Sequence, residues 1–330
     1  MNRPARQLPA YLGDAFLRSE AIAAGVSPRR LRNADLETPF RGVRRKRVEP
    51  RSMPQPGPTG QVSAGHASAA HPLARRRAEH LERAKLYSLI ASDGAFFCGR
   101  TAAVILGLPV ELKPAQELDV GRLYPARAPR ARSIRGVQAR PNLVTLQSTA
   151  GLRTTSPSTT WAMLGRWLSL EELVVLGDAI VNDSRFGRDA STALDAAANA
   201  PGRPRARLLR EALSLVRVGS ASPPETQLRL ALRAARLPEP ELDVDVRDAS
   251  GGLLGRSELA YPESRVAIEY ESDHHRVDQR QWNRDIEKYQ AYAESGWRII
   301  RVTAAMLYTN RGEMVRQVAD ALAVAGRSAR

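Results

Sequence analysis

A short acidic segment near the C-terminus constrains the fold of this chain more than any other feature. In residues 266–271, apolar and charged side chains alternate as in a β-strand, whose successive side chains point to opposite faces. One face carries Val266, Ile268 and Tyr270, and the other carries Ala267, Glu269 and Glu271. Residues 266–268 are too apolar for a strand with one face in open water, so we expect cover on both faces.

The residues before this strand form the other half of a predicted β-hairpin that turns over residues 261–264. This turn pairs Ala260 with Arg265, and it therefore places Glu258 on the acidic face, diagonal to Glu269. Diagonal neighbours on paired strands lie roughly 7–8 Å apart, within reach of long side chains. Because the three carboxylates of this face repel one another, a hard divalent cation such as Mg²⁺ is the simplest compensation. The alternative interpretation is a solvated acidic sheet face.

The charge of the chain is distributed unevenly. The length of 330 residues allows two or three domains, and 43% hydrophobic with 26% charged residues is typical of a folded protein. The net charge of +15 favours a polyanionic partner. Residues 1–51 contain twelve Lys and Arg against five Asp and Glu, residues 52–220 carry a net charge of +9, and the segment from Ala221 is nearly neutral. We therefore expect the basic surface outside the acidic hairpin, although a general solubilising charge bias explains the same excess.

The single cysteine, Cys98, excludes an internal disulfide and a cysteine-based zinc site. No apolar run approaches the roughly eighteen residues that a membrane span needs, and no apolar signal-peptide region follows the first residues. We therefore expect a cytoplasmic protein in a reducing compartment, with no membrane partner.

Two helix starts in quick succession predict an N-terminal helix-turn-helix within residues 1–47. Ser19 caps the first helix, which Gly25 ends, and Ser27 caps the second, with Pro28 at its first position. The exposed face of the second helix and a basic wing after it carry the residue types that bind DNA: Arg29, Arg30, Arg32, Asn33, Arg44, Arg45, Lys46 and Arg47. The alternative is a small helical hairpin with a solvated basic tail.

The rest of the chain divides by composition into three parts. Residues 48–72 are rich in Pro, Ser, Gly and Ala and predict a flexible linker. Residues 73–220 predict a mixed α+β middle domain. Residues 221–330 have the order helix, strand, hairpin, helix, strand, helix around one mixed sheet. The expected fold class is therefore a multidomain α/β protein, with a helix-turn-helix, an α+β middle domain and a C-terminal mixed sheet flanked by helices.

The second helix of the C-terminal part is predicted to begin at Asp278 and to end at Gly296. Apolar side chains recur along it at helical spacing. They define an expected inward face of Trp282, Ile286, Tyr289 and Ala293.

Several motifs of the C-terminal part follow the order of a known nuclease fold: Glu225, Glu258, Glu269-Tyr270-Glu271, His274-His275, Arg284-Asp285 and residues 296–302. With them, residues 222–305 resemble the restriction-endonuclease-like PD-(D/E)XK fold. The resemblance is closer to the very-short-patch-repair (Vsr-like) endonuclease relatives that occur as uncharacterised C-terminal domains in actinobacteria. The N-terminal part with the middle domain, including residues 156–161, is similar to the winged helix-turn-helix AbiEi-type antitoxins of abortive-infection systems.

The resemblance implies which residues carry the chemistry. Glu258 would occupy the first acidic position of the motif, where Asp is usual, and Glu269 the second. Glu271 would stand where the motif often has Lys. The implied reaction is metal-assisted hydrolysis of phosphodiester bonds, with Glu258 and Glu269 as ligands of Mg²⁺ or Mn²⁺. Glu271 or His275 would orient or deprotonate the attacking water.

Other implied site residues have structural explanations as well. Glu225 matches an ancillary acidic position of the family, and it also forms a capping-box pattern with Ser222. His274 and His275 follow the acidic strand, where a surface loop or one structural hydrogen bond also explains a histidine. Arg284 or Lys288 on the next helix suits phosphate binding, and salt bridges within the helix explain the same pattern.

The expected function is that of a DNA-binding, metal-dependent endonuclease in DNA repair or phage defence. The alternative is a non-enzymatic, antitoxin-like transcriptional regulator whose nuclease-fold tail is degenerate. A third hypothesis is a protein-binding module of a defence system. DNA is the expected partner in the first two, and a toxin, another defence-system protein and a second copy of the chain are further candidates.

Overall fold

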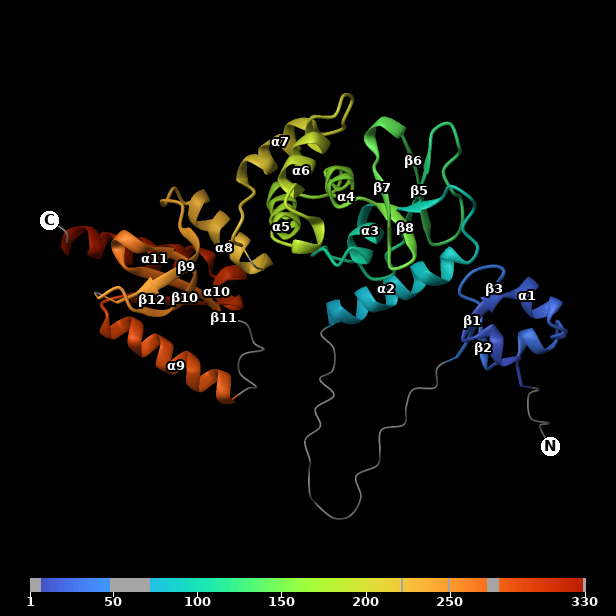
Figure 1. Cartoon of the computed structure of the whole chain (residues 1–330), viewed down its shortest axis with the longest axis horizontal. Helices are drawn as coiled ribbons and strands as arrows, with labels where there is room; N and C mark the ends of the chain where they lie inside the picture. Colours follow the sequence, from blue (N-terminus) through green and yellow to red (C-terminus); the bar gives the residue numbers. More distant parts are fainter. Residues whose placement is uncertain (1–6, 48–71, 221, 249, 272–278, 329–330) are drawn as a thin grey trace, which may run out of the picture. The chain divides into compact units, whose positions relative to one another are not determined.

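The chain divides into two units, residues 1–156 and 157–330. A computed structural model describes residues 7–47, 72–220, 222–248, 250–271 and 279–328. In these residues the fold is α/β, with eleven α-helices and three β-sheets (Figure 1). The unit boundary falls inside residues 73–220, which the sequence predicts as one middle domain. No helix in the described ranges is long and apolar enough to cross a membrane.

The N-terminal segment of the first unit contains a three-stranded antiparallel sheet in the order β1-β3-β2. Its elements are β1 (Ala15–Leu17), α1 (Arg18–Ala23), β2 (Leu36–Glu37) and β3 (Val43–Lys46). The first predicted helix is present as α1, but Leu17 and not Ser19 stands at its N-cap, because the helix already begins at Arg18. The second predicted helix is wrong, because only a 3-10 turn, Arg30–Arg32, forms at its position.

Local contacts explain why a turn replaces the second helix. Ser27 Oγ accepts a hydrogen bond from the Arg30 backbone N–H, as the predicted N-cap would. The Arg30 guanidinium then donates two hydrogen bonds, of 2.9 and 2.7 Å, to the Asp35 carboxylate just before β2. This ion pair ties the turn to the start of the strand. Leu31 is buried, as predicted, but a single 3-10 turn is not the groove-reading helix of a helix-turn-helix.

A five-stranded sheet in the order β6-β5-β4-β8-β7 forms the rest of the first unit. The elements of this part are α2 (Pro72–Ser88), β4 (Phe96–Phe97), α3 (Gly99–Ile105), β5 (Leu118–Leu123), β6 (Ile134–Ala139), β7 (Leu146–Thr149) and β8 (Leu152–Thr155). Phe40 of the N-terminal segment packs into the core of this part, and its ring meets Tyr87 edge to face at 5.4 Å. The N-terminal segment therefore adds residues to the core of this part, and it also has a small cluster of its own around Phe16 and Leu31. Most of the predicted linker, residues 48–71, lies outside the described ranges.

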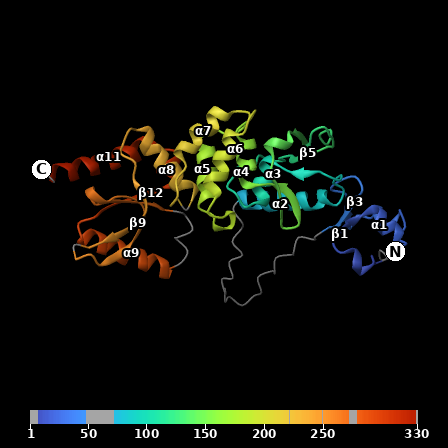
Figure 2. The ribbon, with the colours of Figure 1, turned by 45° about the horizontal axis from the view of Figure 1, so that its top comes forward.

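Four helices begin the second unit (Figure 2). They are α4 (Pro157–Leu164), α5 (Leu170–Val181), α6 (Ala190–Asn199) and α7 (Ala206–Leu215). Helix α5 begins with a capping box, in which Ser169 and Glu172 each accept a hydrogen bond from the other's backbone N–H. Trp161 is fully buried, and its Nε1–H donates to the Leu173 carbonyl at 2.9 Å. This bond fixes α4 against the first turn of α5.

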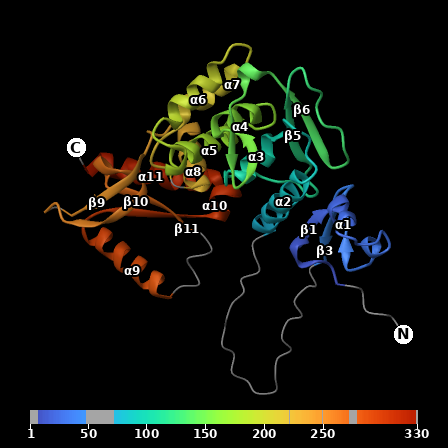
Figure 3. The same cartoon turned by 45° about the vertical axis from the view of Figure 1, so that its right-hand side comes forward.

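The C-terminal part of the second unit is the predicted mixed sheet flanked by helices. Its elements are α8 (Pro223–Ala234), β9 (Glu241–Arg247), β10 (Leu253–Tyr261), β11 (Val266–Glu271), α9 (Gln279–Glu294), β12 (Arg298–Thr303), α10 (Ala304–Tyr308) and α11 (Arg311–Ser328). The strand order is β12-β11-β10-β9, with β11 and β12 parallel and the other pairs antiparallel. Helices α8, α10 and α11 cover one face and α9 covers the other (Figure 3). The predicted order of elements is confirmed, with α10 as an addition.

The hairpin of β10 and β11 has a different register from the one predicted. Ala260 pairs with Ala267 rather than with Arg265. Tyr261 stays in the strand because its ring is buried in the core and its hydroxyl donates to the Pro238 carbonyl at 2.8 Å. The turn therefore begins one residue later than predicted. Because the resulting shift in pairing is two residues, every side chain keeps its predicted face.

A buried ion pair joins the helical and the α/β parts of the second unit. Asp178 on α5 and Arg229 on α8 are 1% and 0% exposed, and Asp178 Oδ2 lies 2.8 Å from Arg229 Nη2. The carboxylate also accepts hydrogen bonds from the Thr226 hydroxyl and the Arg217 backbone N–H. Glu239 binds the guanidinium at Nη1, at 3.2 Å. Two charges that are unfavourable to bury alone therefore satisfy each other.

We expect Asp178→Ala to lower the free energy of unfolding of the second unit by about 3–5 kcal/mol, because Arg229 loses the carboxylate that compensates its buried charge. The double change Asp178→Leu with Arg229→Met is expected to destabilise less. All four tryptophans lie in this unit, so urea unfolding followed by tryptophan fluorescence reports on it. If the single and double variants lose the same free energy of unfolding, the ion pair does not govern stability.

Candidate functional site

Glu258 on β10 and Glu269 on β11 form the centre of the candidate site. They lie two residues along their strands from Ala260 and Ala267, so all four share the sheet face that α9 covers. Continuing the observed register places the two glutamates directly opposite each other, closer than the predicted diagonal placement. Glu269 is only 7% exposed. The acidic face is therefore covered, which excludes the alternative of a solvated face.

Glu258 lies in an electrostatic environment that favours its protonated form. Burial is the largest cause that raises the pKa of its carboxyl to about 7, and the charges of Glu225 and Glu269 act in the same direction. The Tyr270 backbone N–H donates to Glu258 Oε2 at 2.7 Å and, together with the charge of Lys288, lowers this pKa. The carboxyl therefore exchanges its proton near neutral pH, unlike an exposed glutamate.

Helix α9 brings a lysine to the carboxylate pair. Lys288 Nζ lies 2.9 Å from Glu269 Oε1, in an ion pair that is largely buried. The same ammonium lies over the rings of Tyr289 and Tyr292, at 5.6 and 5.4 Å from their centroids. The sequence identifies Lys288 as a phosphate-binding or salt-bridging residue of this helix, but not as the partner of Glu269. The helix-to-sheet packing makes that contact.

The face that α9 presents to the sheet differs in part from the predicted one. Tyr289 contacts Glu271 from this face, and the side chain of Trp282 lies outside the described residues. Tyr292 is fully buried, whereas Ile286 is 49% exposed and Ala293 is also exposed. Tyr292 lies so close to Gly255 that a Cβ added there would be 2.8 Å from the tyrosine hydroxyl. Amphipathic side chains such as Tyr and Lys bury their stems, so a purely apolar pattern misses them. The spacing of Lys288 and Tyr292, one helical turn apart, is the signal that marks this face.

Glu271, the third predicted carboxylate, contacts a different cation. Its Oε1 accepts a hydrogen bond of 2.6 Å from Arg301 Nε on β12 and one of 3.3 Å from the Tyr289 hydroxyl. In the part of the chain that the structure describes, no group of three or more Asp, Glu, His or Cys side chains is placed to hold a metal ion. The described residues therefore bring two of the three carboxylates, Glu258 and Glu269, into electrostatic range of each other on one sheet face.

Two further predicted site residues flank this pair in the sequence. Glu225 is 4% exposed and accepts a hydrogen bond of 2.7 Å from Ser222 Oγ. Since Ser222 Oγ donates to the carboxylate and accepts no backbone hydrogen bond at the helix start, the predicted capping box is incomplete. The effect of Glu225 on the pKa of Glu258 places it within electrostatic range of the site. His274 and His275 lie outside the described residues, so their roles stay predictions.

The predicted DNA-binding residues of the first unit fall into two groups. The side chains of one group bind other residues of the first unit: Arg30 binds Asp35, Arg44 the Leu31 carbonyl, Arg45 Glu37, and Lys46 Asp14. The other group is exposed: Arg29, Arg32 and Arg47. Asn33 is half-buried at the end of the 3-10 turn. These exposed arginines, and not a recognition helix, are the accessible cations of the predicted set.

The raised pKa of Glu258 makes stability depend on pH. Because the folded protein binds this proton more tightly than the unfolded chain, the contribution of Glu258 to stability falls as pH rises from about 4.5 to about 7. Gln stays neutral throughout. We therefore expect Glu258→Gln to raise the melting temperature at about pH 8 and to change it little at about pH 5. Thermal unfolding at both pH values checks this, and Glu263→Gln in the exposed turn is the control; a pH-independent difference would contradict it.

Comparison with curated proteins identifies relatives in Mycobacterium tuberculosis. The chain is similar to "Uncharacterized protein Rv2248" of strain ATCC 25618 / H37Rv and to "Uncharacterized protein MT2308" of strain CDC 1551 / Oshkosh. Each is 28% identical over 174 residues, which cover 53% of this chain and 63% of the relative. The match therefore spans less than two thirds of either relative. No protein-family model matches the chain, and no solved structure matches it significantly.

Proposed function

We propose that the C-terminal part of the chain is a metal-dependent endonuclease domain that hydrolyses phosphodiester bonds of DNA. The observation that carries this proposal is the opposed pair of Glu258 and Glu269, beneath a helix that supplies Lys288. Carboxylates suit a divalent cation, and an ammonium suits the phosphate that such a cation binds. The order of motifs that resembles PD-(D/E)XK nucleases supports the same function.

The carboxylate pair fits a divalent cation in its donor chemistry. Mg²⁺ is commonly held by one or two carboxylates, with waters and substrate phosphates as the other ligands. Burial, and then the charges of Glu225 and Glu269, raise the pKa of Glu258, and a bound cation would favour its ionised form. Glu271 binds Arg301, so Glu258 and Glu269 are the residues that would hold the ion. A bound Mg²⁺ would polarise the scissile phosphate and acidify a bound water.

Lys288 supplies the ammonium that position 271 lacks. It reaches the site from α9 instead of from the acidic strand. An ammonium beside the carboxylate pair stabilises the negative charge that develops on the phosphate oxygens during attack. Glu258 would give up its proton as a cation binds.

The first unit supports DNA as the substrate. Arg29, Arg32 and Arg47 are exposed on its N-terminal segment, and residues 1–156 carry a net charge of +15, equal to that of the whole chain. Exposed arginines bind phosphates without regard to sequence and release counterions as they do so. This binding concentrates the chain on DNA, and the carboxylate pair performs the cleavage.

A non-enzymatic DNA-binding regulator is the second candidate function. The observation that favours it is the neutralisation of the acidic face by the chain itself, because Lys288 pairs with Glu269 and Arg301 pairs with Glu271. In this case the ion pairs stabilise a sheet that no longer binds metal. A cleavage experiment separates the two functions.

We expect the full chain to nick or linearise supercoiled plasmid in the presence of Mg²⁺ or Mn²⁺, and Glu269→Gln to reduce the rate by at least about a hundredfold, because a metal ligand is lost. Agarose gel electrophoresis of the plasmid over time measures the rate. Retained binding of the variant to DNA at low salt shows that only the chemistry has changed.

The matched control is Glu263→Gln, which removes the same charge from the exposed turn of the same hairpin and is expected to cleave normally. Cleavage that survives Glu269→Gln would overturn the assigned site. Absence of cleavage by the parent with either metal, together with salt-dependent DNA binding, would favour the regulator.

We also expect Mg²⁺ to bind more tightly as pH rises from about 6 to about 8, because Glu258 must lose its proton to become a ligand. Calorimetric titration at these pH values, in buffers of different ionisation enthalpy, measures the affinity and the protons released. Glu258→Gln is expected to bind more weakly and to lose this pH dependence. An unchanged pH profile in the variant would remove Glu258 from the ligand set.

A further inference from the structure

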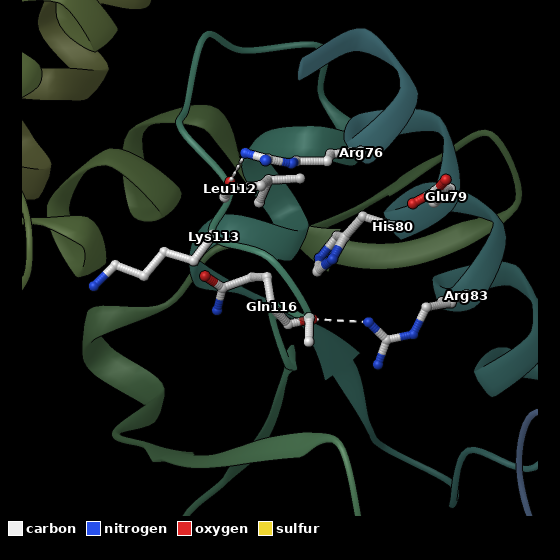
Figure 4. A pocket seen from close by; sticks show the side chains of 8 residues that line it. Arg76, Glu79, His80, Arg83, Leu112, Lys113 and Gln116 are labelled. Atoms are coloured by element: carbon white, nitrogen blue, oxygen red, sulfur yellow. Dashed lines mark hydrogen bonds between the residues drawn. The ribbon is translucent and has the colours of Figure 1, made fainter. Parts of the chain in front are cut away.

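Basic side chains from two segments line a small pocket in the first unit (Figure 4). Its volume is about 220 Å³, and it lies between α2 and the segment 112–116 that precedes β5. Three of its lining side chains are cations, Arg76 and Arg83 from α2 and Lys113 from the segment. Glu79 is the one anion in the lining. The pocket is therefore suited to an anionic ligand.

Backbone carbonyls hold both arginines at the pocket wall. Arg76 Nη1 donates to the Leu112 carbonyl at 3.5 Å, and Arg83 Nη1 donates to the Gln116 carbonyl at 2.8 Å (Figure 4). A guanidinium has five N–H donors, so one carbonyl uses a small part of this capacity. Because these side chains are already held in place, they lose less conformational entropy when a ligand binds.

The charges of the pocket leave a positive excess. Three cations against one anion leave two positive charges, and Glu79 also pairs with Arg75 at 3.6 Å. His80 adds no charge at neutral pH, since its pKa is lowered to about 4, first by burial and then by the charges of Arg83 and Arg77. Its Nε2 lies 2.9 Å from Thr101 Oγ1, which fixes the ring at the base of the lining.

We propose that this pocket binds a phosphate group of the monoester type, as in a mononucleotide. A phosphate monoester carries a charge of about −1.5 to −2 at pH 7 and three strong acceptor oxygens, which match the two excess positive charges and the guanidinium donors. The volume is below the roughly 300–1,000 Å³ of pockets for drug-sized ligands, so it suits the phosphate with part of its ester. This binding does not depend on the carboxylate pair of the second unit.

The experiment titrates the full chain with deoxyadenosine 5′-monophosphate and with inorganic phosphate, by calorimetry at low salt. Lys113→Gln is the informative variant, because Lys113 is exposed and its loss leaves the fold intact. We expect this variant to lower the affinity for both probes about fivefold, because one charge-assisted contact is lost. Lys113→Arg is expected to restore the affinity, because it restores the charge.

The matched control is Lys85→Gln, which removes one exposed lysine from α2 outside the pocket lining and is expected to leave the affinity unchanged. Tighter binding of the nucleotide than of inorganic phosphate assigns the pocket to an ester, and equal binding assigns it to free phosphate.

Three outcomes would overturn the proposal. The first is that neither probe binds, and the second is that Lys85→Gln lowers the affinity as much as Lys113→Gln does. The third is that the chain prefers an oligonucleotide without a terminal phosphate and that this preference depends on Lys113.

Discussion

The burial of Asp178 against Arg229 is the interaction on which the second unit depends. Arg229 lies in the middle of α8, so the ion pair fixes this helix to α5. The same helix buries Leu228 and Leu232 against the sheet and brings Glu225 into range of Glu258. A buried and hydrogen-bonded charge pair specifies one arrangement, whereas apolar contacts alone tolerate sliding. The ion pair thereby holds the helical and α/β parts in one arrangement. This arrangement places the charge of Glu225 near the candidate site.

The candidate site concentrates like charge where a stable sheet would avoid it. Opposed glutamates on paired strands repel, and burial strengthens the repulsion. The chain compensates in two ways, by the ammonium of Lys288 on Glu269 and by the raised pKa of Glu258. Perturbed carboxylates of this kind cluster at functional sites, although structural ion pairs produce them too. The two proposed functions differ in one physical respect, whether a cation competes successfully with Lys288 for the carboxylates.

The sequence predicted the faces of the acidic hairpin correctly and its register incorrectly. Strand alternation fixes which side chains share a face, and the even shift in pairing preserved that result. The register depended on Tyr261, whose hydroxyl bonds to the distant Pro238 carbonyl. The second N-terminal helix was lost for a similar reason, because Arg30 forms an ion pair with Asp35 instead of continuing a helix. In both cases a specific side-chain contact outweighed a local preference.

By itself the sequence determined the order of helices and strands in the C-terminal part, the two-sided burial of β11 and the placement of Glu258 and Glu269 on one face. These follow from periodicity and capping, which act over a few residues. Only the tertiary structure decided which cation contacts each carboxylate. Lys288 contacts Glu269, Arg301 contacts Glu271 and Arg229 contacts Asp178, and these partners are 19, 30 and 51 residues apart in the chain. Such contacts depend on how helices pack against sheets, and no local pattern encodes that packing.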